Sequence, residues 1–281
     1  MMVEHRPGLT FITHAALILG MMVLAFPIYV TFVASTHTLE EIASQFPLLP
    51  GRHLIENYAK ALTLGPRDVG TTVGTMMLNS LIMAVGITFG KITISLIAAY
   101  AIVYFRFPFR MLFFWLIFIT LMLPVEVRIL PTYKVAADLK LLNSYPGLIF
   151  PLIASATATF LFRQFFMTVP DELCEAVRID GGGPIRFFMD ILLPMSRTSI
   201  AALFVILFIY GWNQYLWPLL ITTEEGYYTV LIGIKRMLDV GEGQAEWHII
   251  MASTMLAMIP PVLIVIFMQK QFVRGMTETE K

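Results

Sequence analysis

The sequence has little charge and almost no cysteine. Only 14% of its residues are Asp, Glu, Lys or Arg, whereas soluble domains carry about 25%. The 19 basic residues equal the 19 acidic ones, so no net positive charge favours nucleic acid as a partner. Cys174 is the single cysteine and cannot form an internal disulfide. These shortages argue against a soluble domain, a nucleic-acid-binding protein and a disulfide-stapled fold.

Motifs for catalysis or metal binding are missing as well. The five histidines show no ligand spacing with one another or with Cys174, so we predict neither a metal site nor a nucleophile–base pair. No GxxxxGK[ST] stretch occurs, so any ATP would be hydrolysed by another polypeptide. The sequence therefore predicts a protein that is not an enzyme and that carries no cofactor.

Long apolar runs dominate what remains. Hydrophobic residues make up 58% of the chain, and the mean hydropathy is +0.78. A run of about 20 apolar residues spans the hydrocarbon core of a bilayer. Six long runs contain no Asp, Glu, Lys or Arg: 7–39, 69–90, 111–125, 141–162, 198–223 and 247–269. We therefore predict an all-α integral membrane protein, a single transmembrane domain over 1–281 with six spans at about 12–34, 77–104, 111–131, 145–166, 198–222 and 248–269.

Two of these spans are less regular than the others. The uncharged part of the third, 111–125, has about 15 residues, fewer than a span ordinarily needs. The first apolar stretch is longer than the core of a signal peptide, so we expect it to remain as a span. The small residues at 33–35 leave cleavage there as the alternative.

The distribution of Lys and Arg predicts the orientation. With the N-terminus inside, ten of the 19 basic residues lie on the cytoplasmic side and eight outside, and Lys91 lies within the second span. Most of the ten flank the ends of spans closely, where charge influences orientation most. We therefore expect both termini and the loop 167–197 in the cytoplasm.

The loop 167–197 begins with the signals of a short amphipathic helix. Pro170 suits the first turn of a helix, with Thr168 as its N-cap, and Asp171 and Glu172 complement the positive end of that helix. A narrow stripe at i, i+3, i+4 and i+7 is formed by Leu173, Ala176, Val177 and Asp180. The charged residues at 172, 175 and 178 then point elsewhere.

A glycine turn and a second helix complete this loop. The glycines at 181–183 end the first helix, and Pro184 begins a second that runs to Pro194. A plain connecting loop of about thirty residues would be unusually long. The glycines lack the spacing of a phosphate-binding loop and follow no strand. A rigid docking surface for another protein fits the pattern best.

The same residues resemble the "EAA" loop of permeases of ATP-binding-cassette importers. In that pattern a glycine follows the glutamate by six residues, and Ile-x-Leu-Pro comes after nine more. The positions that carry the resemblance are Glu175, Ala176, Asp180, Gly181, Ile191 and Pro194. The chain departs from the pattern at Val177 and Gly182, where the family favours alanine.

The resemblance implies the type I importer permease fold, with this loop as the coupling helix that docks on a cytoplasmic ATPase dimer. Glu175 would make the charged contact, and Gly181 would allow the turn that presents it. The family also implies a second, homologous permease subunit and a periplasmic solute-binding protein. The outer loop 223–247 would meet the binding protein.

Other strings extend the resemblance over nearly the whole chain, including AAYAIVYFRF (98–107), LMLPVEVRILPTY (121–133) and YGWNQYLWPLL (210–220). They are similar to the carbohydrate branch of these permeases. VEVRILP and ATATFLFRQFFMT resemble the subgroup for sn-glycerol-3-phosphate. This implies a multi-pass protein of the bacterial inner membrane that moves sn-glycerol-3-phosphate or a related glycerophosphodiester by alternating access. Another sugar or polyol of the same branch is the alternative.

Three polar residues inside spans are candidates for the translocation path. Lys91 lies near the middle of the second span, where a charge is costly and usually faces the interior of a bundle. It attracts an anionic solute there or pairs with another span for structure. Asn213 and Gln214 lie within the fifth span and hydrogen-bond either a polyol or a neighbouring helix. Asn79 and Ser80 are expected to cap the start of the second span.

Two other function classes compete with an importer permease. An ion-coupled secondary transporter tends to carry acidic residues within spans or repeated halves, and neither is apparent. An intramembrane enzyme would need a catalytic constellation, which the sequence does not show. Energised uptake without an ATPase partner would favour the secondary transporter.

Overall fold

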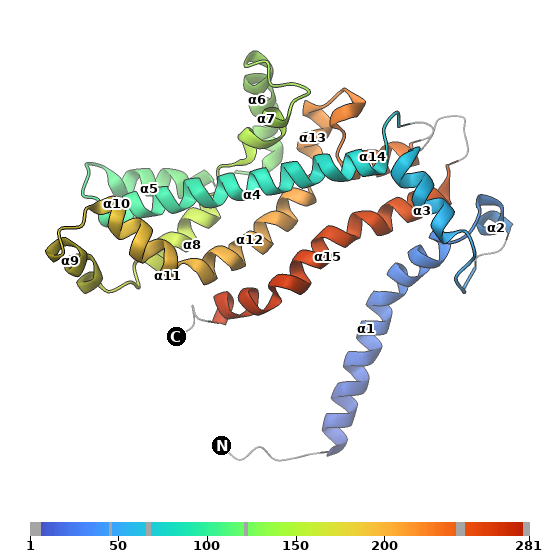
Figure 1. Ribbon diagram of the computed structural model, residues 1–281, viewed down its shortest axis with the longest axis horizontal. Coiled ribbons are helices and arrows are strands. Elements are labelled where there is room, and N and C mark those ends of the chain that lie inside the picture. The colour runs from blue at the N-terminus through green and yellow to red at the C-terminus, as the bar shows by residue number, and fades with distance from the viewer. Residues whose placement is uncertain (1–6, 45–46, 66–68, 121–122, 240–244, 278–281) are drawn as a thin grey trace. The chain divides into compact units, whose positions relative to one another are not determined.

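The computed structural model describes residues 7–44, 47–65, 69–120, 123–239 and 245–277, and in these ranges its regular elements are all helices. The chain divides into two compact units, Met1–Gly74 with Ile234–Met258 and Thr75–Gly233 with Ile259–Lys281. Figure 1 shows the helices with the labels used below. The ends of the chain at residues 1 and 281, predicted to be cytoplasmic, lie outside the described residues. The prediction of a single domain stays a prediction.

The first unit holds α1 (Pro7–Ser35), α2 (Leu39–Ser44) and α3 (Leu54–Thr63). The buried Asn57 ties α3 to the end of α1, because its side-chain amide donates hydrogen bonds to the carbonyls of Ser35 and His37 at 2.9 and 2.8 Å. Thr38 and Glu41 form a capping box at the start of α2. The hydrogen bond from the Thr38 N–H lowers the pKa of the Glu41 carboxyl.

The second unit is built around α4, a helix of 32 residues. Its elements in chain order are α4 (Val73–Tyr104), α5 (Arg110–Ile119), α6 (Val125–Asp138), α7 (Tyr145–Ile149), η2 (Phe150–Leu152), α8 (Ala156–Phe166), α9 (Asp171–Ile179), α10 (Pro184–Phe187), η3 (Phe188–Leu192), α11 (Leu193–Met195), α12 (Arg197–Trp212), α13 (Leu216–Ile221) and η4 (Glu225–Tyr227). The first residues of α4 belong to the other unit, and α14 (Val230–Leu238) and α15 (Trp247–Thr277) contribute to both.

Three helices within the described residues are long and apolar enough to cross a membrane, at Thr10–Ser35, Val73–Tyr104 and Trp247–Gln269. Two further spans are added if bent pairs of helices each count as one: Tyr145–Leu152 with Ala156–Phe166, bent by 50°, and Pro184–Met195 with Arg197–Trp212, bent by 69°. The structure therefore gives three to five candidate spans by length, where the sequence predicted six.

The predicted third span, 111–131, is wrong as a continuous helix. α5 ends at Ile119, and α6 begins as a separate helix at Val125. Pro124 precedes α6 with an extended ψ of 144° and has no N–H to donate, so it cannot continue a helix from α5. Hydropathy alone did not locate this break, because the apolar run continues across it.

The predicted fifth span, 198–222, is also interrupted. α12 ends at Trp212, and α13 starts at Leu216. In a continuous helix the ring of Pro218 would meet the carbonyl of Gln214 and leave that carbonyl without a donor. Asn213 and Gln214 therefore lie at a helix break and not inside a helical span.

Small residues let α4 pack closely against its neighbours. A Cβ on Gly86 or Gly90 would overlap the side chains of Ile149 and Ile153, which flank η2. Helix α12 approaches α4 closely as well, because a Cβ on Gly211 of α12 would lie 2.9 Å from the Cα of Ala84. Small residues at helix crossings are how membrane helices bring their backbones together.

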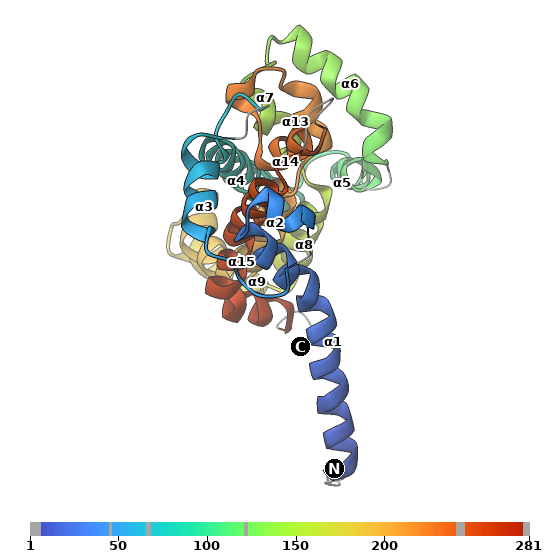
Figure 2. The ribbon, with the colours of Figure 1, turned by 90° about the vertical axis from the view of Figure 1, so that its right-hand side faces the viewer.

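Two apolar clusters lie along α4. One joins α4, α8, α10 and α12 through buried residues such as Leu96, Phe162 and Leu192. The other joins α4 to α6, α7 and α13, with Ile87 and Trp217 among its buried residues. The helices α6, α7 and α13 lie together on one side of α4 in Figures 1 and 2. The indole N–H of Trp217 donates to the carbonyl of Gly147 at 3.0 Å, which fixes α13 to α7.

Asn79 and Ser80 hold a loop and do not cap α4, which begins at Val73. The Asn79 amide donates to the carbonyls of Gly226 and Tyr228 at 2.8 and 3.0 Å, and the Ser80 hydroxyl accepts from the N–H of Val230 at 2.9 Å. The predicted capping role is therefore wrong. Both side chains are buried and fix the segment 226–230 to α4.

The contact of α4 with α12 gives a first testable prediction. Gly211→Leu should lower the free energy of unfolding by about 1–3 kcal/mol, because the added side chain meets the backbone of Ala84 and cannot be accommodated without displacing α12. Gly226→Ala is the matched control, since a Cβ at the exposed Gly226 meets nothing within 4 Å. Thermal unfolding of the purified protein in detergent measures both. Equal midpoints for the two variants would contradict the close crossing.

Candidate functional site

The helix predicted in the loop 167–197 is α9, and it lies with α10 beside one end of α4 (Figure 1). α9 begins at Asp171, so Pro170 is its N-cap and does not lie in its first turn. Thr168 does not cap the helix, because its hydroxyl donates to the carbonyl of Phe165 at 2.7 Å. Asp171 and Glu172 do occupy the first turn, as predicted, where negative charge is favourable.

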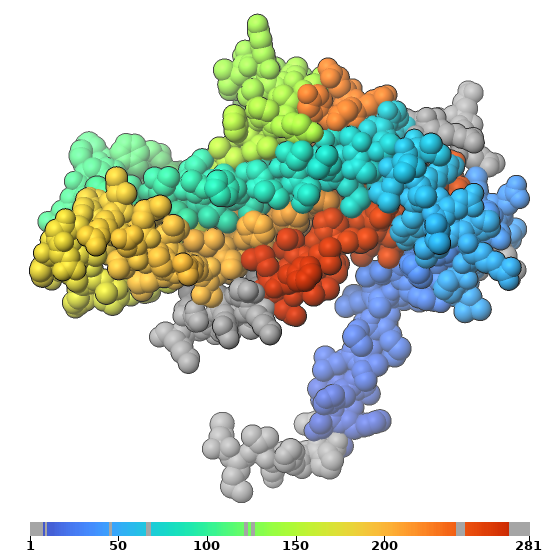
Figure 3. Space-filling view, in the orientation of Figure 1, coloured from blue at the N-terminus to red at the C-terminus, as the bar shows by residue number. Residues whose placement is uncertain are grey.

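The two faces of α9 have different surroundings. Leu173, Cys174 and Val177 pack against the apolar cluster of α4, α8 and α12. Glu175 and Ala176 are exposed and do not belong to this cluster. The predicted stripe is therefore corrected at one position, because Cys174 and not Ala176 shares the packed face. Figure 3 shows the segment 171–187 on the surface of the second unit, where another protein could reach it.

Gly181 ends α9 in a left-handed conformation, with φ of +74°. Its N–H donates to the carbonyl of Arg178 at 3.1 Å, and the N–H of Gly182 donates to that of Val177 at 2.8 Å. These two hydrogen bonds define a Schellman motif, which satisfies the last carbonyls of a helix. Asp180 is the exposed C-cap residue. The predicted glycine turn is confirmed in this detail.

The second predicted helix runs from Pro184 to Met195 as α10, η3 and α11, with η3 as a π-helix. Ile191 is half-buried against the apolar cluster that α9 also contacts. Pro194, three residues later, is half-buried as well. Phe187 and Leu192 are buried and fix the segment to the core. Ile191 and Pro194 are therefore partly buried in the packing of the loop, whereas Glu175 and Ala176 are exposed.

Two tyrosines of α4 tie this loop to the membrane part of the unit. The Tyr100 hydroxyl donates to the carbonyl of Pro184 at 2.9 Å, and the Tyr104 hydroxyl donates to that of Phe166 at 3.2 Å. The Tyr104 ring also meets the Phe187 ring edge-on, with centroids 5.1 Å apart. The sequence analysis missed both residues. Their spacing of four at the end of an apolar helix was the available signal.

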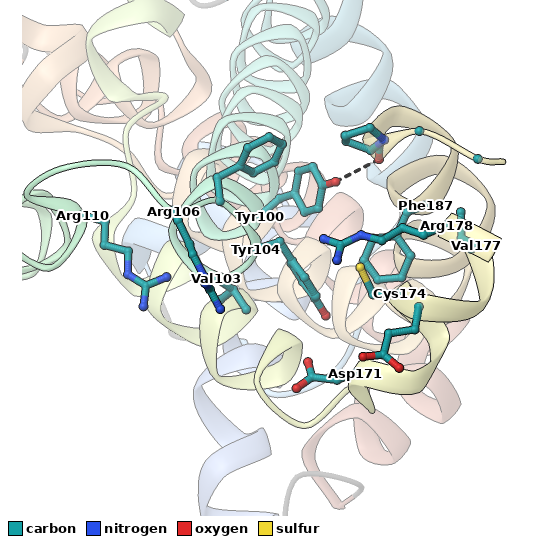
Figure 4. A pocket seen from close by; sticks show the side chains of 15 residues that line it. Tyr100, Val103, Tyr104, Arg106, Arg110, Asp171, Cys174, Val177, Arg178 and Phe187 are labelled. Atoms are coloured by element: carbon teal, nitrogen blue, oxygen red, sulfur yellow. Dashed lines mark hydrogen bonds between the residues drawn. The ribbon is translucent and has the colours of Figure 1, made fainter. Parts of the chain in front are cut away.

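A cavity of about 780 Å³ separates α9 from the end of α4 (Figure 4). Arg106 and Arg110 come from the α4–α5 side, and Asp171, Glu175 and Arg178 come from α9. Among the described residues no ion pair joins these five charges. The cavity therefore presents charges of both signs next to the exposed face of α9, which suits a protein partner with complementary charges.

The candidate path residues lie elsewhere in the unit, and the structure brings two of the three together. Lys91 is 7% exposed, and its ammonium lies 3.8 Å from the centroid of the Tyr210 ring. The Gln214 amide donates to the carbonyl of Tyr210 at 3.1 Å. Asn213 is exposed at the end of α12 and is not part of this group.

The chain matches a family model described as the inner membrane component of binding-protein-dependent transport systems, over residues 91–278. This match includes Lys91, the loop 167–197 and the helix break at 213–215. The chain belongs to this family. Membership agrees with the resemblance stated for the loop and with the apolar helices of the structure.

Relatives of this inner membrane component are similar over their full length. A protein of Agrobacterium fabrum called the sn-glycerol-3-phosphate transport system permease protein UgpE is 58% identical, with 100% of both chains covered. Proteins of the same name from Escherichia coli and Brucella melitensis are 58% and 57% identical, again over 100% of each chain. The relatives are permease proteins and not ATPases, in agreement with the prediction that this chain is not an enzyme.

A solved structure confirms the fold of the family member. A chain of a bacterial ABC transporter involved in the import of the acidic polysaccharide alginate superposes with a TM-score of 0.82. The two sequences are 19% identical, and the superposition covers 97% of this chain and 100% of the transporter chain. The predicted permease fold is therefore confirmed at the level of architecture.

The Schellman turn gives the second prediction. Gly181→Ala should destabilise the end of α9 by about 1–2 kcal/mol, because a side chain at a positive φ meets the following carbonyl. Gly183→Ala is the matched control: Gly183 has φ of −85°, and a Cβ there meets nothing within 4 Å. Hydrogen exchange at residues 181 and 182 should accelerate in the first variant alone. Equal exchange in both variants would show that the turn does not need a glycine.

Proposed function

We propose that this chain is the permease subunit of an ATP-driven importer that moves sn-glycerol-3-phosphate across the bacterial inner membrane. The observation that carries the proposal is the exposed face of α9, where Glu175 and Ala176 are accessible in the loop that resembles the family's docking loop. The relatives that are 57–58% identical over the full chain are named as sn-glycerol-3-phosphate permeases, which supports sn-glycerol-3-phosphate as the solute. A related glycerophosphodiester, or another sugar or polyol, is the alternative solute.

The proposed coupling runs from α9 into α4. An ATPase dimer would grip the exposed face of α9, with Glu175 as the charged contact and the Gly181 turn presenting it. Tyr100 and Tyr104 connect the loop to α4, so a displacement of α9 would move the end of α4 with it. Closure of the ATPase dimer would in this way be converted into alternating access by rigid-body movement.

The remaining parts of the assembly follow from the family. A second, homologous permease would complete the pore together with the helices of this chain. A solute-binding protein would dock on the outer side, where Asn79, Ser80 and Asn143 fix the segment 223–230. We propose six spans with both termini in the cytoplasm, so that α9 and the ATPase share one side of the membrane.

The function is tested by reconstitution. Proteoliposomes that contain this chain with its homologous permease, the ATPase and the binding protein should accumulate sn-glycerol-3-phosphate only when ATP and the ATPase are present. Omission of the ATPase is the control and should abolish accumulation. Accumulation driven by an ion gradient without the ATPase would overturn the proposal in favour of a secondary transporter.

The docking role of Glu175 gives a separate prediction. Glu175→Lys should leave the protein inserted and folded but should reduce uptake at least about tenfold, because it places a like charge against the basic partner expected in the ATPase. ATP hydrolysis should fall less than uptake, so the two become uncoupled. Asp138→Lys, an exposed change at the end of α6, should leave both rates unchanged. Normal uptake by the Glu175 variant would remove Glu175 from the docking contact.

A further inference from the structure

A buried cation without an acidic partner lies near the middle of α4. Lys91 is 7% exposed, and its Nζ contacts the face of the Tyr210 ring at 3.8 Å. Among the residues that the structure describes, no Asp or Glu pairs with it. A charge removed from water without a partner is strongly unfavourable, so this arrangement favours an anion.

Two interrupted helices meet α4 at this same point. The break between η2 and α8 lies against it, because Gly90 packs on Ile153 and the Ser95 hydroxyl donates to the carbonyl of Ser155 at 3.2 Å. Lys91 therefore lies between two contacts with this first break. Irregular backbone at membrane depth occurs where it is buried in protein or lines a cavity.

The second break lies on the Tyr210 side of Lys91. α12 ends at Trp212, two residues after Tyr210, and α13 starts at Leu216. Within the break, Gln214 is held by its hydrogen bond to the Tyr210 carbonyl at 3.1 Å. Interrupted helices that meet near the membrane midplane are where transporters commonly bind their solutes.

We propose that Lys91, Tyr210 and Gln214 form an anion-binding subsite inside the membrane, which takes the phosphate group of the solute as it passes. The ammonium of a lysine supplies a point charge and three donors for phosphate, and the amide of Gln214 offers the one N–H that its bond to Tyr210 leaves over. The inference rests on the proposed function, since it names the part of the solute that this chain recognises.

The subsite acts after the binding protein has released the solute. The apparent affinity for uptake reflects capture outside the membrane, so loss of the subsite should appear in the maximal rate. Lys91→Gln should lower the maximal rate of sn-glycerol-3-phosphate uptake about tenfold or more, whereas Lys91→Arg, which keeps the charge, should retain most of it. Lys134→Gln removes an exposed charge from α6 and is the matched control, with an unchanged rate.

A second measurement separates this role from a purely structural one. In a gluconate buffer with little phosphate, Lys91→Gln should raise the thermal midpoint of the purified complex, because it removes a buried charge that has no carboxylate partner. With the binding protein left out, addition of sn-glycerol-3-phosphate should raise the midpoint of the original complex and leave that of Lys91→Gln unchanged. A lysine that only supports the fold would give the opposite result, a lower midpoint for the variant and the same response to the solute in both.

The outcomes distinguish the subsite from the proposed function. If the unaltered complex accumulates sn-glycerol-3-phosphate with ATP, but Lys91→Gln does so at the same maximal rate for equal membrane levels, the subsite is wrong and the function stands. If the unaltered complex accumulates nothing, the proposed function fails and the subsite fails with it. A tenfold loss in Lys91→Gln together with an unresponsive thermal midpoint supports both.

Discussion

The close packing of α4 against its neighbours is the constraint on which the second unit depends. Gly86 and Gly90 admit the side chains of Ile149 and Ile153, and Gly211 lets α12 approach the backbone of Ala84. Larger residues at these positions would push the helices apart. This spacing brings Tyr210 to Lys91 and α4 to the two interrupted helices, so the site proposed around Lys91 depends on small residues that carry no chemistry of their own.

α4 also reaches the loop 167–197. Its last turns carry Tyr100 and Tyr104, which hold α9 and α10 through a hydrogen bond to Pro184 and a ring contact with Phe187. One helix therefore connects the surface proposed for the ATPase with the cation proposed for the solute. Packed helices move as bodies rather than bend continuously, so a displacement at the Tyr104 end of α4 has to change the packing around Lys91 near its middle.

The sequence was a good guide where the signal was local. Proline, glycine and the charges of the first turn predicted both helices of the loop and the turn at Gly181, and the family resemblance was confirmed over the full chain. The sequence analysis failed where a helix break lay inside an apolar run, as at Pro124 and before Pro218. Hydropathy does not show that a proline lacks the N–H that a continuous helix needs. Tyr100 and Tyr104 were missed because their contacts are with segments distant in sequence.

The most direct test of the central claim is whether α4 and the loop move together. A pair of spin labels at Ile97→Cys on α4 and Met189→Cys on η3, both exposed positions, would be placed in a Cys174→Ala background of the assembled transporter. Electron–electron resonance then measures their separation without nucleotide and with ATP bound. The account predicts the same distance in both states, because Tyr100 and Tyr104 fix the loop to α4. A distance that changes between the states would contradict it, since the loop would then move independently of the helix that carries Lys91.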